Sequence, residues 1–106
     1  MTPATCRLIY LWLPSADLAV ARVAESVRRG GHTVPEVVIR RRYERSLSNF
    51  FNSYRMLADS WLMLDNSLQT APGAIAWREI GGPIHIVSGG PWEGLRKAYE
   101  KDSFSN

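Results

Sequence analysis

Cysteine is almost missing from this sequence, since Cys6 is the only one. A disulfide framework and a cysteine-based metal site are therefore excluded, and the reducing cytoplasm is the expected location. Long apolar runs are missing too, because the run from Leu8 to Leu13 is too short for a membrane span or a signal-peptide core. We expect no membrane partner, and we expect Cys6 to be a small buried residue beside a strand.

Positive charge is in only small excess. Thirteen Lys and Arg residues against ten Asp and Glu residues give a net charge of +3. A nucleic-acid-binding domain carries a stronger basic stripe, so we expect no nucleic-acid partner, whereas a small anionic ligand is compatible with this charge. The 106 residues suffice for a single domain or a fragment of one (residues 1–106).

The first third of the chain predicts a strand followed by a helix. Residues 7–13 are almost continuously apolar, which is typical of a strand covered on both faces in a parallel sheet. Pro14 ends this strand and Ser15 can cap the next helix. Apolar residues at helical spacing then continue to Val27, and Gly30 is expected to stop the helix.

The rest of the chain predicts a second helix, a strand, a hairpin and a last helix. The second helix is expected from Pro35 to about Asp59, and a break near residues 52–53 is the alternative. A second apolar strand covers residues 61–64, a β-hairpin covers 74–80 and 84–87, and a short helix covers 91–101. The predicted fold class is α/β, with about two buried strands, which are few for a self-sufficient parallel sheet.

Arginines gather around a glycine pair and form the main candidate site. Arg28 and Arg29 end the first helix, and Arg41 and Arg45 lie one turn apart on the second. Guanidinium groups bind phosphate oxygens two at a time, so these four side chains predict a phosphate-binding site, with Arg22 and His32 nearby and the Gly30-Gly31-His32 segment as a flexible hinge. The alternative is an ordinary solvated basic face.

Other catalytic patterns are weak. Gly89 and Gly94 have four residues between them, as in a phosphate-binding loop, but Leu95 and Arg96 follow where that loop needs Lys and then Ser or Thr. No spacing of histidines or carboxylates predicts a metal site or an acid–base pair. We therefore assign no catalytic residue and no metal ligand.

Several segments together resemble the C-terminal half of the zeta-toxin-like P-loop kinases. The resemblance covers residues 7–67 well and the hairpin and helix at 74–101 more loosely. It is carried by LIYLWLPS (8–15), ARVAE (21–25), GGHTVP (30–35), IRRRY (39–43) and DNS (65–67). Its most specific part is the Gly-Gly-His-x-Val-Pro segment with the arginines and tyrosine that follow.

The resemblance implies a parallel sheet flanked by helices and an ATP- and magnesium-dependent phosphoryl transfer to a small hydroxyl substrate. It implies that the segment from Arg28 to Arg45 is a lid, in which Arg41 and Arg45 face the transferred phosphate. It also implies that Asp65, Asn66 and Ser67 lie near the adenine, at the carboxyl end of a strand.

The family's phosphate-binding loop, its catalytic base and its first strands have no counterpart here. We therefore expect no catalysis by this chain alone, and we expect an exposed strand edge and exposed apolar faces. Three interpretations stay open: a kinase-derived fragment with at most weak nucleotide or phosphate binding, a small non-enzymatic interaction or dimerisation module, and an enzyme completed by a separate N-terminal half.

Overall fold

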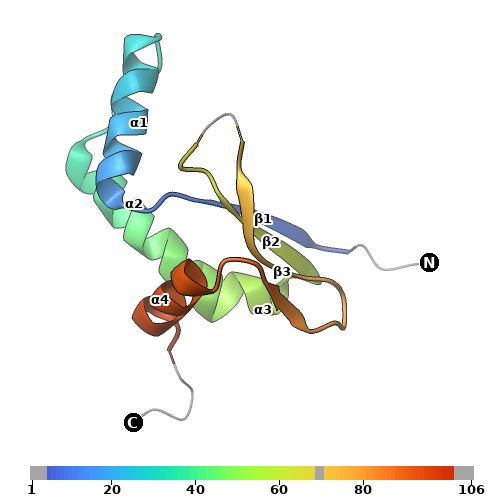
Figure 1. The fold of residues 1–106 in the computed structure, drawn as a ribbon. Coiled ribbons are helices and arrows are strands. Elements are labelled where there is room, and N and C mark those ends of the chain that lie inside the picture. Colours follow the sequence, from blue (N-terminus) through green and yellow to red (C-terminus); the bar gives the residue numbers. More distant parts are fainter. Residues whose placement is uncertain (1–4, 69–70, 102–106) are drawn as a thin grey trace.

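The computed structural model describes residues 5–68 and 71–101, which form a mixed four-stranded sheet with helices (Figure 1). The strands are β1 (Arg7–Trp12), β2 (Ser60–Asp65), β3 (Gly73–Arg78) and β4 (Ile84–Ile86), in the order β1-β2-β3-β4. β1 and β2 are parallel, whereas β3 and β4 each pair antiparallel with the strand before them. The α/β class, the parallel pair and the C-terminal hairpin with its closing helix are confirmed.

The first helix, α1 (Ala16–Arg28), begins and ends as its sequence predicts. The Ser15 hydroxyl accepts a hydrogen bond from the Leu18 N–H at 3.1 Å. At the other end Gly30 has a φ of +98°, and the N–H groups of Gly30 and Gly31 donate to the carbonyls of Val27 and Ser26. These two bonds form a Schellman motif. The glycine pair that we expected to be a flexible hinge is therefore a helix cap with defined hydrogen bonds.

The second helix is continuous but changes its winding. It runs from α2 (Glu36–Asn49) through the π-helical turn η1 (Phe50–Tyr54) into α3 (Arg55–Leu57). Pro35 lies at the N-cap rather than inside the helix. The helix thus runs on through residues 52–53, where a break was the alternative, and in the wider π turn the adjacent side chains of Phe50 and Phe51 are both fully buried.

The core lies on one face of the sheet, where α2, η1 and α4 (Gly89–Tyr99) pack. Aromatic rings dominate it: Trp61 stacks on Trp92 with centroids 5.5 Å apart, and Phe50 meets the edge of Trp61 at 5.4 Å. The buried residues of this core are Trp12, Leu47, Phe50, Phe51, Trp61, Met63, Ile75, Ala76 and Trp92. The core is therefore formed by residues that are distant from one another in the sequence.

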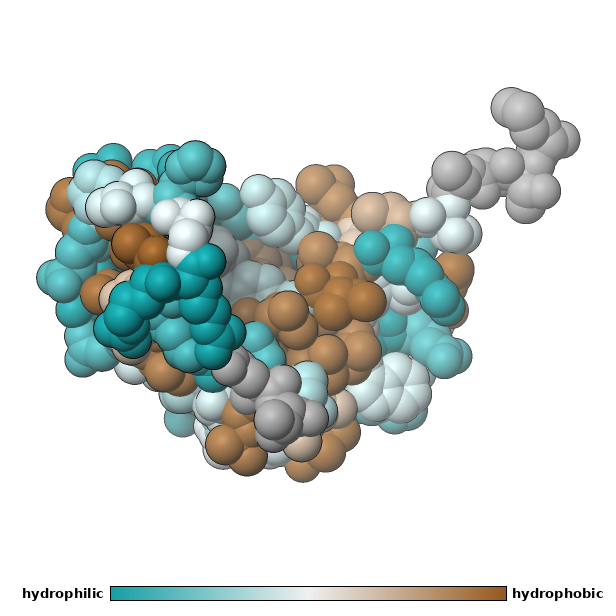
Figure 2. All heavy atoms as spheres, turned by 90° about the horizontal axis from the view of Figure 1, so that it is seen from above, coloured by the Kyte–Doolittle hydropathy of each residue, from teal (hydrophilic) through white to brown (hydrophobic). Residues whose placement is uncertain are grey.

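The opposite face of the sheet is not covered by any described residue. Ile9 is 65% exposed and Leu11 is 54% exposed, although an apolar run such as 7–13 indicated a strand covered on both faces. Figure 2, which views the molecule from above, shows apolar side chains gathered on this side. β1 is also an edge strand, so the exposed edge and apolar face expected from the resemblance are both present.

Cys6 differs from its prediction. It lies just before β1 and is exposed, because the strand that follows is an edge strand without a neighbour on its outer side. Within the described ranges no helix has the length and apolarity needed to cross a membrane.

Candidate functional site

The net positive charge of the chain resides on α1, α2 and the segment that joins them, which we call the helical arm (residues 16–49). Seven arginines stand there against four carboxylates, an excess of three, which equals the net charge of the whole chain. The remaining residues balance, with six basic and six acidic side chains. A long-range attraction for anions is therefore centred on the arm.

Two of the arm's arginines are already paired with carboxylates. The Arg40 guanidinium lies 2.7 Å from Asp17 Oδ1 and 3.3 Å from Glu36 Oε2, and these hydrogen bonds raise its pKa above the ordinary value. Arg29 lies 2.8 Å from Glu25 Oε1. These exposed pairs neutralise charge locally without adding much stability.

Arg28, Arg41, Arg42 and Arg45 are exposed and form no ion pair with the described residues. Arg41 and Arg45 lie one turn apart on α2, on the stripe opposite Tyr43 and Leu47, so both reach solvent in the same direction. This part of the predicted arginine site therefore keeps its charge available.

The four arginines predicted as one site fall into two pairs along the arm. The contact between Arg40 and Asp17 places the second turn of α2 beside the first turn of α1. Arg28 and Arg29 lie eleven or more residues further along α1, which is about 16 Å at 1.5 Å per residue. Arg41 and Arg45 are together, whereas Arg28 and Arg29 are at the far tip of the arm, next to the exposed His32.

Arg22 does not join the free arginines. Its guanidinium donates to the backbone carbonyls of Asn66 and Ser67 at 2.9 and 2.8 Å. It thereby ties α1 to the loop after β2, and its donors are used for structure. Sequence spacing alone could not reveal these bonds, because the partners lie 44 and 45 residues away.

The loop of Asp65, Asn66 and Ser67 lies at the carboxyl end of the parallel strand pair. The Asn66 N–H donates to the Trp12 carbonyl at 2.8 Å, which joins the ends of β1 and β2. Asp65 Oδ1 accepts the Ser67 N–H at 2.9 Å and forms an Asx turn. Asp65 and Ser67 also line a cavity of about 210 Å³. The predicted loop is thus a rigid turn at the strand ends, where open α/β sheets bind ligands.

A groove of about 340 Å³ between the arm and β1 contains a residue that the sequence analysis did not select, Arg42. It shares the lining with Tyr10 and Ser46, whose hydroxyl oxygens lie 2.7 Å apart. Burial raises the pKa of the Tyr10 phenol, so this hydroxyl stays protonated and can act as a donor or an acceptor. The signal was present in the sequence, because Ile39, Arg42 and Ser46 share one helical stripe.

The chemistry available at this end of the sheet is the binding of an anion. In the part of the chain that the structure describes, no three His, Cys, Asp or Glu side chains gather where a metal ion could bind. Guanidinium groups and hydroxyls suit phosphate oxygens, whereas magnesium requires oxygen ligands that the arm's side chains do not group together.

Comparison with known proteins gave no relatives: no family model, no curated protein and no solved structure matches this chain.

Proposed function

We propose that this chain corresponds to the lid and C-terminal half of a zeta-toxin-like ATP-dependent kinase, and that it binds phosphate weakly without transferring it. The observation that carries the proposal is the set of exposed arginines on α2 that form no ion pair with the described residues, of which Arg42 lines the groove beside β1. Electrostatic stabilisation by such groups is the main protein contribution to phosphoryl transfer.

The arm fits the phosphate groups of ATP better than any other part of that ligand. Arg41 and Arg45 supply two adjacent forks of donors, and Arg42 brings a third to the edge of the groove. The family resemblance supplies ATP and magnesium as the ligands. For this chain we propose contacts to phosphate oxygens only, in the cytoplasm that its cysteine content favours.

The test is a titration of the isotope-labelled chain with ATP, with and without magnesium, followed by amide chemical shifts. We expect shifts on α2 at millimolar ATP, and their loss in an Arg41→Ala, Arg45→Ala double variant. An Arg40→Ala, Arg96→Ala variant is the matched control, because it removes the same charge from arginines that are already paired. Equal loss in both variants would indicate a diffuse charge effect rather than a site.

The same titration of an Arg42→Ala variant tests whether the phosphates lie toward the groove. If the phosphates lie toward the groove, this variant weakens the shifts of Tyr10 and Ser46 more than those of Arg45. An absence of shifts at millimolar ATP would contradict the proposal, and magnesium-dependent micromolar binding would contradict its weak-binding part.

A second candidate function, an interaction module, is favoured by the uncovered apolar face of the sheet. An accessible apolar face enhances the fluorescence of an anilinonaphthalene dye, and a Leu62→Lys variant, altered in the middle of that face, lowers this signal. If neither chain enhances the fluorescence, the face is not accessible and the module proposal fails, unless a second copy already covers it.

A further inference from the structure

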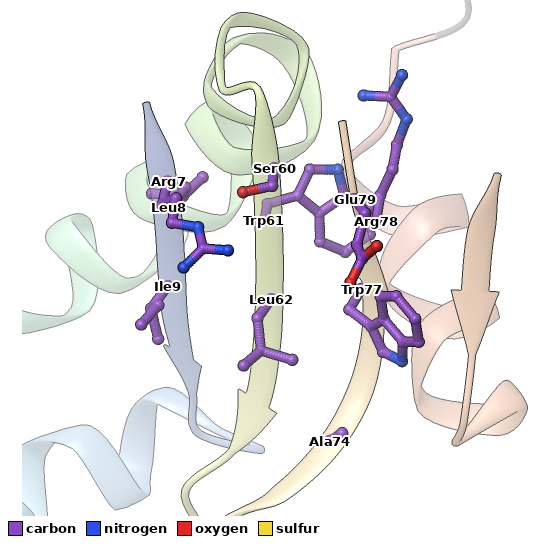
Figure 3. A pocket seen from close by; sticks show the side chains of 10 residues that line it. All are labelled: Arg7, Leu8, Ile9, Ser60, Trp61, Leu62, Ala74, Trp77, Arg78 and Glu79. Carbon is purple, nitrogen blue, oxygen red and sulfur yellow. The ribbon is translucent and has the colours of Figure 1, made fainter. Parts of the chain in front are cut away.

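The uncovered face of the sheet has an ordered pattern of side chains across its strands. β1 pairs with β2 and β2 with β3 in a register that places Ile9, Leu62 and Trp77 in one row. The next row holds Leu11, Leu64 and Ala74. Figure 3 shows the side chains of Ile9, Leu62 and Trp77 side by side across the three strands. Two apolar rows therefore cross the centre of this face.

Trp77 widens this face toward β4. Its indole stacks on the His85 ring with centroids 4.0 Å apart and an interplanar angle of 14°. Ile9, Leu62, Ala74 and Trp77 line an open hollow of about 470 Å³ on this face. A flat aromatic platform on β3 thus stands opposite a projecting aliphatic side chain on β1.

Two opposite charges stand at one end of the same face, on the two strands that flank β2. Arg7 begins β1, and Glu79 directly follows β3. Both side chains line the hollow (Figure 3), but neither forms an ion pair with a described residue. Ser60 of β2 pairs with Arg7 and separates the two charged positions.

We propose that this face binds a second copy of the same chain, related by a two-fold axis that runs along β2. Such an axis exchanges the positions of β1 and β3 and keeps the two ends of the strands in place. Arg7 of one copy then faces Glu79 of the other, and the reciprocal pair forms at the same time. Ile9 of each copy meets the Trp77 platform of the other.

The charge arrangement favours a second copy over an unrelated partner. In a two-fold contact, residue i of one copy meets residue j of the other and the reverse, so charges on this face pair with opposite charges when they sit at equal distances on the two sides of the axis. Arg7 and Glu79 meet this condition because β1 and β3 are the two neighbours of β2. Two apolar layers at about 10 Å spacing also form the usual core of a β-sandwich.

The size of the face sets the expected strength. The three strands that overlap across this axis, β1, β2 and β3, at about 4.8 Å each, and six residues at about 3.3 Å give a footprint of roughly 15 by 20 Å. A contact of this size is smaller than a stable interface, so we expect a weak dimer with a dissociation constant of roughly tens of micromolar. This inference rests on the second candidate function, the interaction module, whose partner it names.

The decisive experiment uses charge reversal in trans, measured by analytical ultracentrifugation. In an Arg7→Glu homodimer both reciprocal pairs become Glu–Glu, and in a Glu79→Arg homodimer both become Arg–Arg. Each variant alone should dimerise at least about tenfold more weakly. An equimolar mixture should regain the wild-type affinity, because the heterodimer restores both opposite-charge pairs. Failure of the mixture to recover would overturn the proposed axis.

Two further variants locate the contact. Leu62→Lys lies at the centre of the face and should weaken dimerisation by about 100-fold, since it brings an unpaired charge to a buried surface. Val37→Lys is the control for an added surface charge, because Val37 is an exposed apolar residue of α2, at 64%, and lies outside the sheet. Pairing through the open edge of β1 would instead survive Leu62→Lys, and that result would contradict the face-to-face arrangement.

The outcomes separate this inference from the interaction module itself. The chain could stay monomeric at 100 μM and still enhance dye fluorescence, with the enhancement lowered by Leu62→Lys. This result would contradict the proposed dimer but would be consistent with an interaction module that binds a different partner. A monomer without dye binding overturns both. Circular dichroism melts of every variant confirm that the compared chains are folded.

Discussion

The helical arm and the aromatic end of this molecule are stabilised in very different ways. The aromatic end combines η1, β2, β3 and α4 around rings that are almost completely buried. α1, in contrast, contains no buried residue, and Leu47 is the one buried residue of the arm, which otherwise rests on half-buried side chains and a few hydrogen bonds. The part of the chain that carries the available positive charge is thus the part with the least buried surface, which is common for ligand-binding elements.

Specific hydrogen bonds connect these two regions. The Tyr43 hydroxyl donates to the Leu13 carbonyl at 2.7 Å, and Tyr99 Oη donates to Glu44 Oε2 at 2.5 Å. Together with Arg22 on the loop after β2, these bonds fix the orientation of the arm relative to the sheet. The arm therefore has a defined position even though few of its side chains are buried.

The largest expected effect tests the aromatic end. Phe51→Ala removes a fully buried ring that contacts Phe50 and Trp92, so it should lower the free energy of unfolding by about 3–5 kcal/mol. Val23→Ala in the arm should cost only about 1 kcal/mol, because that side chain is half-buried. Urea unfolding of both variants checks the comparison, and equal losses would show that the arm is as tightly packed as the core.

The next effect concerns the contact that holds α4 to the long helix. Arg55 donates to Glu100 and lies over the rings of Phe51 and Trp92, at 5.4 and 5.8 Å. Because this pair is mostly shielded from water, Arg55→Ala should cost about 2 kcal/mol. Arg96→Ala, which breaks more exposed pairs with Glu93 and Glu100, should lower the free energy of unfolding by clearly less than Arg55→Ala does. A double-mutant cycle with Glu100→Gln measures the coupling directly.

The C-terminal cap of α1 should have a smaller effect on stability, and its control, a glycine substitution inside α4, should change stability in the opposite direction. Gly30→Ala forces an L-residue to a φ of +98° and should cost about 1 kcal/mol. Gly94→Ala lies inside α4 at an ordinary φ, and a Cβ there meets no atom within 4 Å, so it should stabilise by about 0.5–1 kcal/mol. Thermal melts of the two variants should shift in opposite directions, and a stabilising Gly30→Ala would contradict the cap.

The smallest effect is absent at neutral pH and emerges above pH 10. Burial, followed by the hydrogen bond to Glu44, raises the pKa of Tyr99 above its ordinary value of 10.0. The folded chain therefore holds this proton when the unfolded chain releases it, so stability is full below pH 10 and falls as the pH rises further. Urea unfolding at about pH 9 and pH 11 should show a smaller loss for Tyr99→Phe than for the wild-type chain. Tyr10 and Tyr43 contribute in the same direction.

Local patterns predicted most of the elements because they depend on short-range chemistry. The Ser15 cap, the stop at Gly30, the hairpin around residues 81–83 and the long second helix all follow from residues within a few positions of each other. The π turn at η1 could not be predicted from local patterns, because it is stabilised by the burial of Phe50 and Phe51 against Trp61 and Trp92. Those partners come from later parts of the chain.

The candidate site was predictable in its residue types but not in its arrangement. The sequence indicated Arg41 and Arg45 correctly as a neighbouring pair, because helical spacing is fixed. It could not separate Arg42, which forms no ion pair with a described residue, from the paired Arg40, since that distinction depends on Asp17 of another helix. Whether these arginines bind phosphate stays a prediction.

Neighbours along the chain suffice to predict most helices and strands, the cap and stop of α1 and the gathering of arginines around residues 28–45, because each depends on short-range spacing. Tertiary contacts establish which of these arginines form no ion pair with the described residues, that Arg22 holds the loop after β2, and that no described segment covers one face of the sheet. These features arise from contacts between residues tens of positions apart, and periodicity within a single segment carries no information about such partners.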